Sequence, residues 1–385
     1  MRDFLRNEAN GGLALLLGSI AALLWVNVVD PASYVSFWGT HLNVGIGDAS
    51  IDESLGHWVN DGLMTLFFFL ISLEIKRELV TGELRHPKRA ALPIIAALGG
   101  IVVPIAIFFA ITGGKDASGW GIPMATDAAF AIGVLALLGD RVGIGVKLFL
   151  VTIAVVDDVA AIGVIAVAYT DHLSLGWLGL AIAGLLVVAA MRALGVRRIL
   201  AYVPLGIFVW VATFESGVHA TLAGVALALL TPAVPVGGRD VLGELEHGLH
   251  PWVNLAILPL FALANAGVKL SGGELSDADG RRIALAVALG LVVGKFIGIA
   301  GATWAALRLR LGTLPPGVDR RGLLGAAALG GIGFTVSLFI TPLAYDDPLL
   351  VGAAKLGILG GSVVAATIGI TIFLTGRHPA PPPAG

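Results

Sequence analysis

Long apolar runs recur along the whole 385-residue chain. A helix that crosses the hydrocarbon core of a membrane needs about 20 consecutive, mostly apolar residues. Twelve stretches of about this length, divided by charges, prolines or glycine clusters, lie near residues 12–29, 57–75, 90–112, 118–138, 146–169, 176–191, 199–213, 217–231, 251–268, 283–306, 322–342 and 352–375. The seventh and eighth are short for complete spans. Because lipid offers the backbone no hydrogen-bond partners, these runs predict an all-α, polytopic membrane protein with 12 transmembrane helices.

The composition agrees with a membrane protein. Charged residues make up 13% of the chain and apolar residues 57%, whereas a soluble domain carries about 25% charged residues. The chain has no cysteine, which excludes disulfides, thiolate metal sites and iron–sulfur clusters. The formal net charge of -2 and the scattered basic residues argue against a nucleic-acid partner. We therefore expect neither a resident cofactor nor a nucleic acid.

The basic residues predict how the helices are oriented, because Lys and Arg favour the cytoplasmic ends of spans. If both termini lie in the cytoplasm, the outer side holds only Lys115, Lys269, Arg281 and Arg282. Two more, Lys295 and Lys355, fall inside predicted spans, and every other one of the 24 basic residues lies on the inner side. This asymmetry favours an even number of spans.

A short external hairpin is predicted between the first two spans. Leu42, Val44 and Ile46 alternate with smaller or polar residues, and Gly47 supplies turn chemistry. Two short strands near 41–51 would leave unpaired edges in water, and pairing with the same hairpin of a second copy would satisfy them. The hairpin therefore predicts a homodimer.

Residues 1–376, including the hairpin, are expected to form one transmembrane domain. The tail, 377–385, is rich in proline and predicted to be disordered.

Four charged residues lie in the middle of apolar spans: Asp127 in the fourth, Asp157 and Asp158 in the fifth, and Lys295 in the tenth. A charge at the bilayer centre costs about 2.5 to 3.5 kcal/mol even on lenient scales, so each one needs a reason. A structural salt bridge between helices is one reading. Three carboxylates and one ammonium, however, leave a net negative charge, which a bound cation or protons would have to neutralise.

Carboxylate and hydroxyl oxygens suit a hard cation. Asp127, Asp157, Asp158 and the Thr126 hydroxyl are therefore candidate ligands for a transported cation. Consecutive residues of a helix diverge by about 100°, so one of the adjacent carboxylates can face a cavity while the other meets Lys295.

Helix-weakening residues interrupt two spans. The fourth contains Gly121 and Pro123 just before Thr126 and Asp127, and the eleventh contains the run 330–335, with three glycines followed by Phe and Thr. Paired interruptions in two halves of a transporter indicate broken helices that cross at the membrane midplane. Segments of about 90–169 and 283–375 would then be inverted repeats of three helices each.

At these residues the chain resembles the NhaA family of bacterial sodium/proton antiporters. The similarity runs through nearly the whole chain in order, at residues 73–79 (LEIKREL), 125–131 (ATDAAFA), 156–158 (VDD), 216–224 (SGVHATLAG), 245–252 (LEHGLHPW), 294–295 (GK), 330–335 (GGIGFT) and 354–359 (AKLGIL).

The resemblance implies an activity. Members exchange more than one inward proton for each sodium or lithium ion that they expel, electrogenically and with activation at alkaline pH, in sodium and pH homeostasis. It also implies a multi-pass protein of the prokaryotic inner membrane, with the fourth and eleventh helices unwound, and a homodimer.

The resemblance also implies roles for individual residues. Asp158 would be the principal sodium ligand with Asp157 beside it, and Lys295 the charge partner of Asp157, while Asp127 and Thr126 would sit at the helix crossing. The residues associated with the pH response would be Glu74, Glu78, Glu246, His250 and His219. Ser72, where the family usually has Gly, and Gly330, which replaces another small residue, depart from the pattern.

Other classes fit the sequence less well. The string 290–296 resembles a phosphate loop but lacks one spacer residue and ends in Phe. An intramembrane aspartyl protease would need Asp140, which lies at a helix end. His247 and His250 next to Glu246 lack the i, i+4 spacing of a zinc protease, and a polar, solvated helix start is the simpler interpretation. A cation channel stays open, because apolar periodicity does not separate conduction from exchange.

Overall fold

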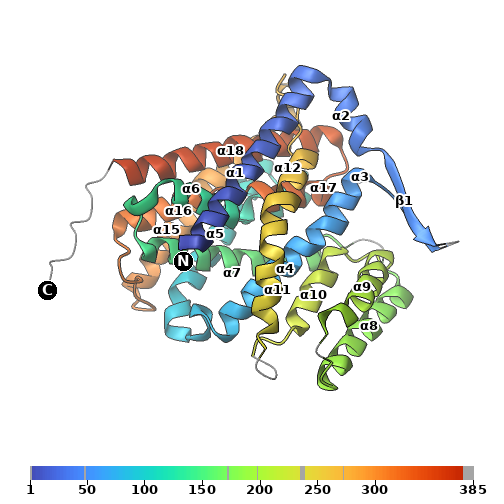
Figure 1. Ribbon diagram of the computed structural model, residues 1–385. Coiled ribbons are helices and arrows are strands. Elements are labelled where there is room, and N and C mark those ends of the chain that lie inside the picture. The colour runs from blue at the N-terminus through green and yellow to red at the C-terminus, as the bar shows by residue number, and fades with distance from the viewer. Residues whose placement is uncertain are drawn as a thin grey trace.

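The computed structural model describes residues 2–46, 49–170, 173–196, 198–234, 239–271 and 273–375. Most of these residues are helical, and within them the strands form one hairpin (Figure 1). The predicted tail and the hairpin residues Gly47 and Asp48 lie outside the described residues. The helical fold class is confirmed.

The helices follow one another along the chain with short irregular connections. In the first part they are α1 (Arg2–Leu24), α2 (Pro31–Trp38), α3 (Leu55–His57), α4 (Met64–Val80), α5 (Pro87–Thr112), α6 (Ala128–Leu137), α7 (Ile144–Ala168), α8 (Leu175–Ala193), α9 (Val203–Glu215) and α10 (Thr221–Leu230). They continue with α11 (Val241–Trp252), α12 (Leu258–Asn265), α13 (Gly273–Ser276), α14 (Ala278–Leu289), α15 (Lys295–Arg308), α16 (Arg320–Leu329), α17 (Phe334–Ala344) and α18 (Pro348–Leu374).

Short turns of other helix types extend or join these helices. The π-helical turns are η1 (Trp25–Val29), η2 (Trp58–Leu63), η7 (Val253–Ile257) and η8 (Gly290–Gly294). The 3-10 turns are η3 (Glu83–Arg85), η4 (Ala117–Met124), η5 (Gly139–Arg141) and η6 (Ile199–Ala201).

Eight helical stretches in the described part of the chain are long and apolar enough to cross a membrane: Asn10–Val29, Arg89–Thr112, Ala117–Leu137, Ile144–Ala168, Leu175–Ala193, Ala278–Arg308, Arg320–Ala344 and Pro348–Leu374. Two shorter apolar helices, Ile199–Glu215 and Thr221–Leu230, coincide with the two predicted short spans. The predicted runs 57–75 and 251–268 fall on helices that contain π turns η2 and η7. The protein is therefore a multi-pass membrane protein.

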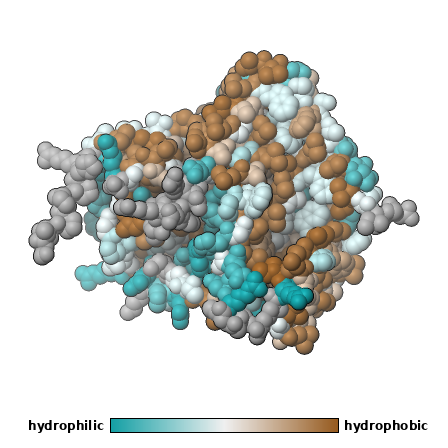
Figure 2. Space-filling model, in the orientation of Figure 1, coloured by the Kyte–Doolittle hydropathy of each residue, from teal (hydrophilic) through white to brown (hydrophobic). Residues whose placement is uncertain are grey.

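Apolar side chains cover broad areas of the surface (Figure 2). Val167 is 86% exposed and Leu200 is 83% exposed, which water would penalise and lipid would not. The stretch Arg320–Ala344, in contrast, is almost entirely buried. The segment formed by α16 and α17 therefore runs through the centre of the molecule, whereas α8 and α9 lie at its edge (Figure 1).

A close approach of α5 and α15 sets the position of Lys295. An added Cβ at Gly99 would lie 2.3 Å from the carbonyl oxygen of Gly298, and one at Gly100 would lie 3.5 Å from Cδ of Lys295. Only glycine allows the two helices to come this close. The buried Lys295 is thereby held between α5 and the centre of the bundle.

The hairpin predicted between the first two spans is confirmed. Strands β1 (His41–Ile46) and β2 (Ala49–Ser54) pair antiparallel, with His41 opposite Ser54. The second strand is longer than predicted and ends where the Ser54 hydroxyl accepts a hydrogen bond from His57 N at 3.2 Å. This contact caps α3 and joins the hairpin to the following helix.

Candidate cation site

Two interrupted helices meet in the centre of the molecule. The first consists of η4, the non-helical residues 125–127 and α6; the second consists of α16, a turn at residues 330–333 and α17. Asp127 N donates to the carbonyl oxygen of Ile332 at 2.6 Å, and the Thr126 hydroxyl lies 2.8 Å from the carbonyl oxygen of Gly330. The two interruptions are thus joined directly by hydrogen bonds.

Asp127 caps two helices at once. Its Oδ1 accepts from Phe130 N at 2.9 Å, at the start of α6. Its Oδ2 accepts from Thr335 N at 3.0 Å and from Thr335 Oγ1 at 2.7 Å, at the start of α17. Both helix N-termini carry partial positive charge, which stabilises the carboxylate. The buried negative charge is therefore compensated mainly by backbone groups.

Asp157 faces a fixed cation. Its Oδ2 accepts from Lys295 Nζ at 2.5 Å and lies 2.7 Å from the Thr126 hydroxyl. The side chains of Asp157 and Lys295 are both fully buried. The Thr126 hydroxyl has one proton for two acceptors, Asp157 Oδ2 and Gly330 O, so it links α7 to both interrupted helices.

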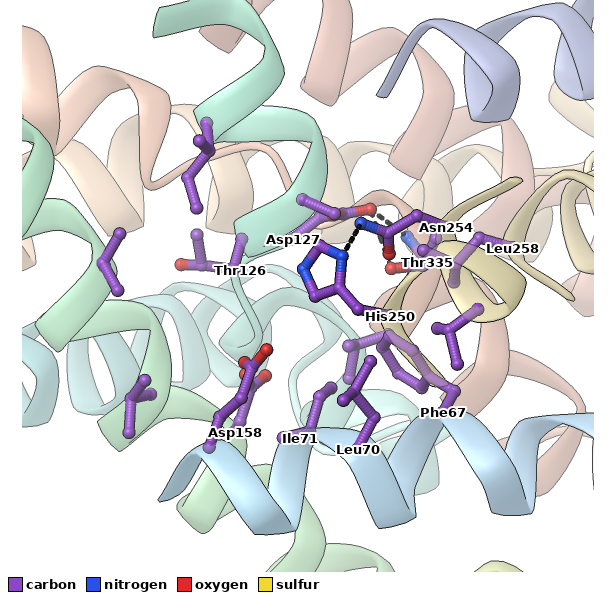
Figure 3. Close-up of a pocket in the computed structure, with 18 residues that line it drawn as sticks. Phe67, Leu70, Ile71, Thr126, Asp127, Asp158, His250, Asn254, Leu258 and Thr335 are labelled. Atoms are coloured by element: carbon purple, nitrogen blue, oxygen red, sulfur yellow. Dashed lines mark hydrogen bonds between the residues drawn. The ribbon is translucent and has the colours of Figure 1, made fainter. Parts of the chain in front are cut away.

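Asp158 faces a cavity of about 60 Å³ instead. The cavity lies between α4, α6, α7 and the α11–α12 helix, and Figure 3 shows Asp127, Thr335, Asn254 and His250 grouped across it from Asp158. Three carboxylates line it, those of Asp158, Asp127 and Glu74, and among the described residues no lysine or arginine does. A cavity of this charge and size suits a small cation or water.

The residues assigned to the pH response lie at different distances from this cavity. Glu74 and His250 line it, whereas Glu78 and His219 do not. Glu246 forms an ion pair with Arg77 of α4, and its side chain is 6% exposed. For Glu246 the interpretation of this cluster as a solvated helix start is wrong, because Arg77 of α4 contacts its buried side chain, whereas His247 is exposed.

Two side chains of the cavity were not recognised in the sequence. Asn254, in π turn η7, is 5% exposed and places its Nδ2 3.5 Å from His250 Nδ1. Thr335 is noted above only as part of a helix interruption, and the structure makes it a double donor to Asp127. Nothing in the local pattern around Asn254 could reveal its position, because a π turn changes which residues face inward.

Comparison with known proteins accounts for this arrangement. Residues 2–373 match the family model described as Na+/H+ antiporter 1. The chain belongs to the NhaA family of Na+/H+ antiporters. A relative named Na(+)/H(+) antiporter NhaA 2, from Erythrobacter litoralis, is 46% identical over 378 residues, which cover 98% of this chain and 94% of the relative.

Two more NhaA relatives extend the comparison. Na(+)/H(+) antiporter NhaA 3 of Frankia alni is 45% identical over 408 residues, covering 97% of this chain and 88% of the relative. Na(+)/H(+) antiporter NhaA of Shigella dysenteriae is 44% identical over 374 residues, covering 96% of each chain. NhaA proteins are secondary transporters, so the protein is not an enzyme, and the aspartyl protease reading is excluded.

Proposed function

We propose that the protein is an electrogenic antiporter that expels sodium or lithium in exchange for inward protons, is activated at alkaline pH, and serves sodium and pH homeostasis. One observation carries this proposal: Asp158 faces a negatively lined cavity, while the adjacent Asp157 is held by Lys295. A single negative site that accepts a sodium ion or a proton, but not both, gives obligatory exchange without contact between the two ions.

Asp158 is the principal sodium ligand in this proposal, with Asp157 beside it. Asp127 and Thr126 hold the helix crossing in place, and the cavity supplies further oxygen atoms from Glu74 and Thr335. Sodium is cargo here, so these oxygen ligands must bind it reversibly and release it again.

Lys295 is the coupling element. Pairing with Asp157 offsets part of the cost of burying both charges. A sodium ion entering at Asp158 competes with the ammonium for Asp157, so the pair loosens and Lys295 can release its proton. Release of that proton adds to the proton from Asp158 and makes the exchange electrogenic.

The proposed pH response has two parts. Protons compete with sodium for Asp158, so acid lowers the apparent sodium affinity without a separate sensor. Glu74, Glu78, Glu246, His250 and His219 shift the midpoint further. The contact of Glu246 with Arg77 supports this assignment, because it ties α11, which carries His250, to α4, which carries Glu74.

The proposed topology has 12 spans in one transporter domain of residues 1–376, with both termini in the cytoplasm of a bacterium and the spans in its inner membrane. Segments 90–169 and 283–375 are inverted repeats whose interrupted helices cross at the midplane; NhaA is itself one of the transporters on which this general rule rests. In each segment a long helix, an interrupted helix and a second long helix follow in order, which supports the proposal.

The homodimer through the hairpin near 41–51 is also a proposal. The exposed edges of β1 and β2 support it, because a second copy can continue the sheet. Deleting the hairpin should give monomers that still transport, as measured by size-exclusion chromatography and vesicle assays.

The experiment that tests the function uses the purified protein in vesicles with a preset proton gradient. A sodium pulse should dissipate the gradient, whereas the Asp158→Asn protein should insert normally and leave the gradient intact. A cation channel would conduct sodium without moving protons. Normal exchange by Asp158→Asn would refute the role of Asp158.

A further inference from the structure

An ion pair at the end of the bundle opposite the Arg77–Glu246 contact joins the two proposed repeats. Arg282 of α14 donates from Nη2 to Asp116 Oδ2 at 2.8 Å, and the same nitrogen lies 2.8 Å from Asp279 Oδ1. Asp116 lies in the connection between α5 and η4. The Arg282 side chain is 20% exposed and that of Asp116 is 32% exposed, so their contact is partly shielded from water.

Asp116 has an unusual backbone conformation. Its φ of 50° lies in the left-handed region, which most residues with a Cβ avoid and which Asp adopts more readily than most. The carbonyl oxygen of Asp116 accepts a hydrogen bond from Tyr345 Oη at 2.9 Å. Burial and the neighbouring Asp116 carboxylate raise the pKa of Tyr345, so its phenol stays protonated and remains a donor. Arg282 and Tyr345 thus hold Asp116 from two sides.

The same segment leads directly to the cation site. Asp116 is the residue before η4, a 3-10 helix, whose hydrogen-bond geometry is weaker than that of an α-helix. Side chains of other helices hold its carbonyl oxygens: Tyr169 Oη donates to Ser118 O at 2.6 Å, and Ser337 Oγ donates to Ile122 O at 2.6 Å. Three residues after η4 ends, the chain reaches Asp127.

Close packing fixes the segment further. An added Cβ at Gly119 would lie 2.0 Å from Tyr345 Oη, and one at Gly121 would lie 2.7 Å from Tyr169 Oη. The two tyrosines therefore touch the backbone of η4 itself. Because η4 is packed this closely, a shift of η4 along its axis would also displace Thr126 and Asp127.

We propose that Arg282, Asp116 and Tyr345 form an outer clamp that sets the depth of Thr126 and Asp127 in the bundle and thereby the apparent affinity for sodium. The inference rests on the proposed antiport function. These are positioning residues, because none of them lines the cavity. Ion ligands must be held within about 0.5 Å of their productive places, so a small displacement of η4 weakens binding.

The clamp acts on affinity more than on the fold. Partly exposed ion pairs contribute little to stability, and α5, α7, α14 and α17 keep their apolar packing when the Arg282 charge is removed. We therefore expect Arg282→Gln to raise the apparent KM for sodium about fivefold or more, with the maximal rate within about twofold of wild type, and Tyr345→Phe to raise it by a smaller factor.

Arg281→Gln is the matched control. Arg281 is exposed, adjacent in sequence, and forms no hydrogen bond or ion pair with the connection before η4 among the described residues. Sodium-dependent proton release in vesicles gives KM and maximal rate for each variant, and thermal unfolding in detergent reports on the fold. The conservative variant Arg282→Lys keeps a positive charge beside Asp116 and Asp279 and should retain at least half of the affinity that Arg282→Gln loses.

The outcomes separate the clamp from the function. An unchanged KM in both Arg282→Gln and Tyr345→Phe overturns the clamp, as does an equal rise in Arg281→Gln. If the Arg282→Gln protein does not insert into the membrane, the KM of Tyr345→Phe alone tests the clamp. A wild-type protein that releases no protons on addition of sodium refutes the antiport function instead, and calorimetric sodium binding to the same variants then tests the clamp.

Discussion

The two faces of α7 at residues 157 and 158 differ in what neutralises their charge. Asp157 meets an ammonium and a hydroxyl that belong to the protein, and its side chain is fully buried. Asp158 faces a cavity in which the other charged side chains are acidic or histidine. A rotation of about 100° between consecutive helix residues is enough to separate these environments.

This difference separates two tasks. A carboxylate with a fixed partner contributes to the stability of the bundle, and removing either partner leaves an uncompensated buried charge. A carboxylate without a fixed basic partner is available to a mobile ion. We therefore propose that Asp157 acts mainly in stability and Asp158 mainly in transport, and each of the following variants tests one of these two roles.

The largest contrast is expected between Asp157→Asn and Asp158→Asn in thermal unfolding. The first leaves the Lys295 ammonium buried without its partner and should lower stability by about 3 to 5 kcal/mol. The second should change stability by less than about 1 kcal/mol, because among the described residues no basic side chain forms an ion pair with Asp158. The loss of stability in each variant is measured by heating the detergent-solubilised protein and quantifying the remaining folded protein by size-exclusion chromatography. Equal losses would contradict the assignment.

Lys295→Gln should give the next largest effect. Asp157 keeps the Thr126 hydroxyl and can take up a proton, so we expect a loss of about 2 to 3 kcal/mol and fewer protons moved per sodium. Lys355→Gln is the control, because Lys355 lies in α18 and has no carboxylate within ion-pair distance among the described residues. A stable Lys295→Gln protein that still builds a membrane potential would refute the proton-carrier role.

A smaller effect should follow from Glu74→Gln, which acts on the cavity face alone. Removing one of the three lining carboxylates should raise the apparent KM for sodium about tenfold, equivalent to about 1.4 kcal/mol, and leave thermal stability unchanged. Glu215→Gln is the control, since Glu215 is exposed at the end of α9 and outside the cavity lining. Similar KM values for both variants would mean that Glu74 is not close enough to act on the ion.

Thr126→Val should give the smallest change. It removes one hydroxyl donor shared by Asp157 and Gly330 and should lower stability by about 1 kcal/mol. Thr126→Ser keeps the hydroxyl and should behave as wild type in the same unfolding assay. A loss in Thr126→Ser as large as in Thr126→Val would show that the methyl group, and not the hydroxyl, is what matters.

The sequence was sufficient to find the charged residues at the centre of the protein. Asp127, Asp157, Asp158 and Lys295 stand out because each lies in an apolar run, where any charge is expensive. The helical fold class and the hairpin follow from equally local patterns. Such patterns depend on the spacing of residues along a single segment.

The remaining features depend on contacts between segments. The polar start of its own helix predicts a solvated Glu246, but the packing of α4 against α11 buries it beside Arg77. Asp127 could be recognised as a charge, but its role as a cap for α17 requires residues more than 200 positions away. Asn254 and Thr335 are uncharged, so placing them in an apolar span carries no large free-energy cost that would single them out in the sequence.

The π turn η8 makes the orientation of Lys295 depend on the geometry of the residues that precede it. It supplies the residues 290–294 between α14 and the first residue of α15. Glycines at both ends of it pack tightly, with an added Cβ at Gly290 2.7 Å from Pro123 and one at Gly294 2.7 Å from Pro104.

A π turn holds one residue more than the α-helical turn it replaces, so the helix on either side keeps its register. Removing one residue from it, such as Val292, would restore α-helical geometry and leave Lys295 facing Asp157. Forcing residues 290–294 into α-helical geometry at the same length would instead rotate Lys295 by about 100° away from Asp157. A gap at this point in an alignment would thus mark a relative that keeps the lysine contact and has one residue fewer in the turn that packs against Pro104 and Pro123.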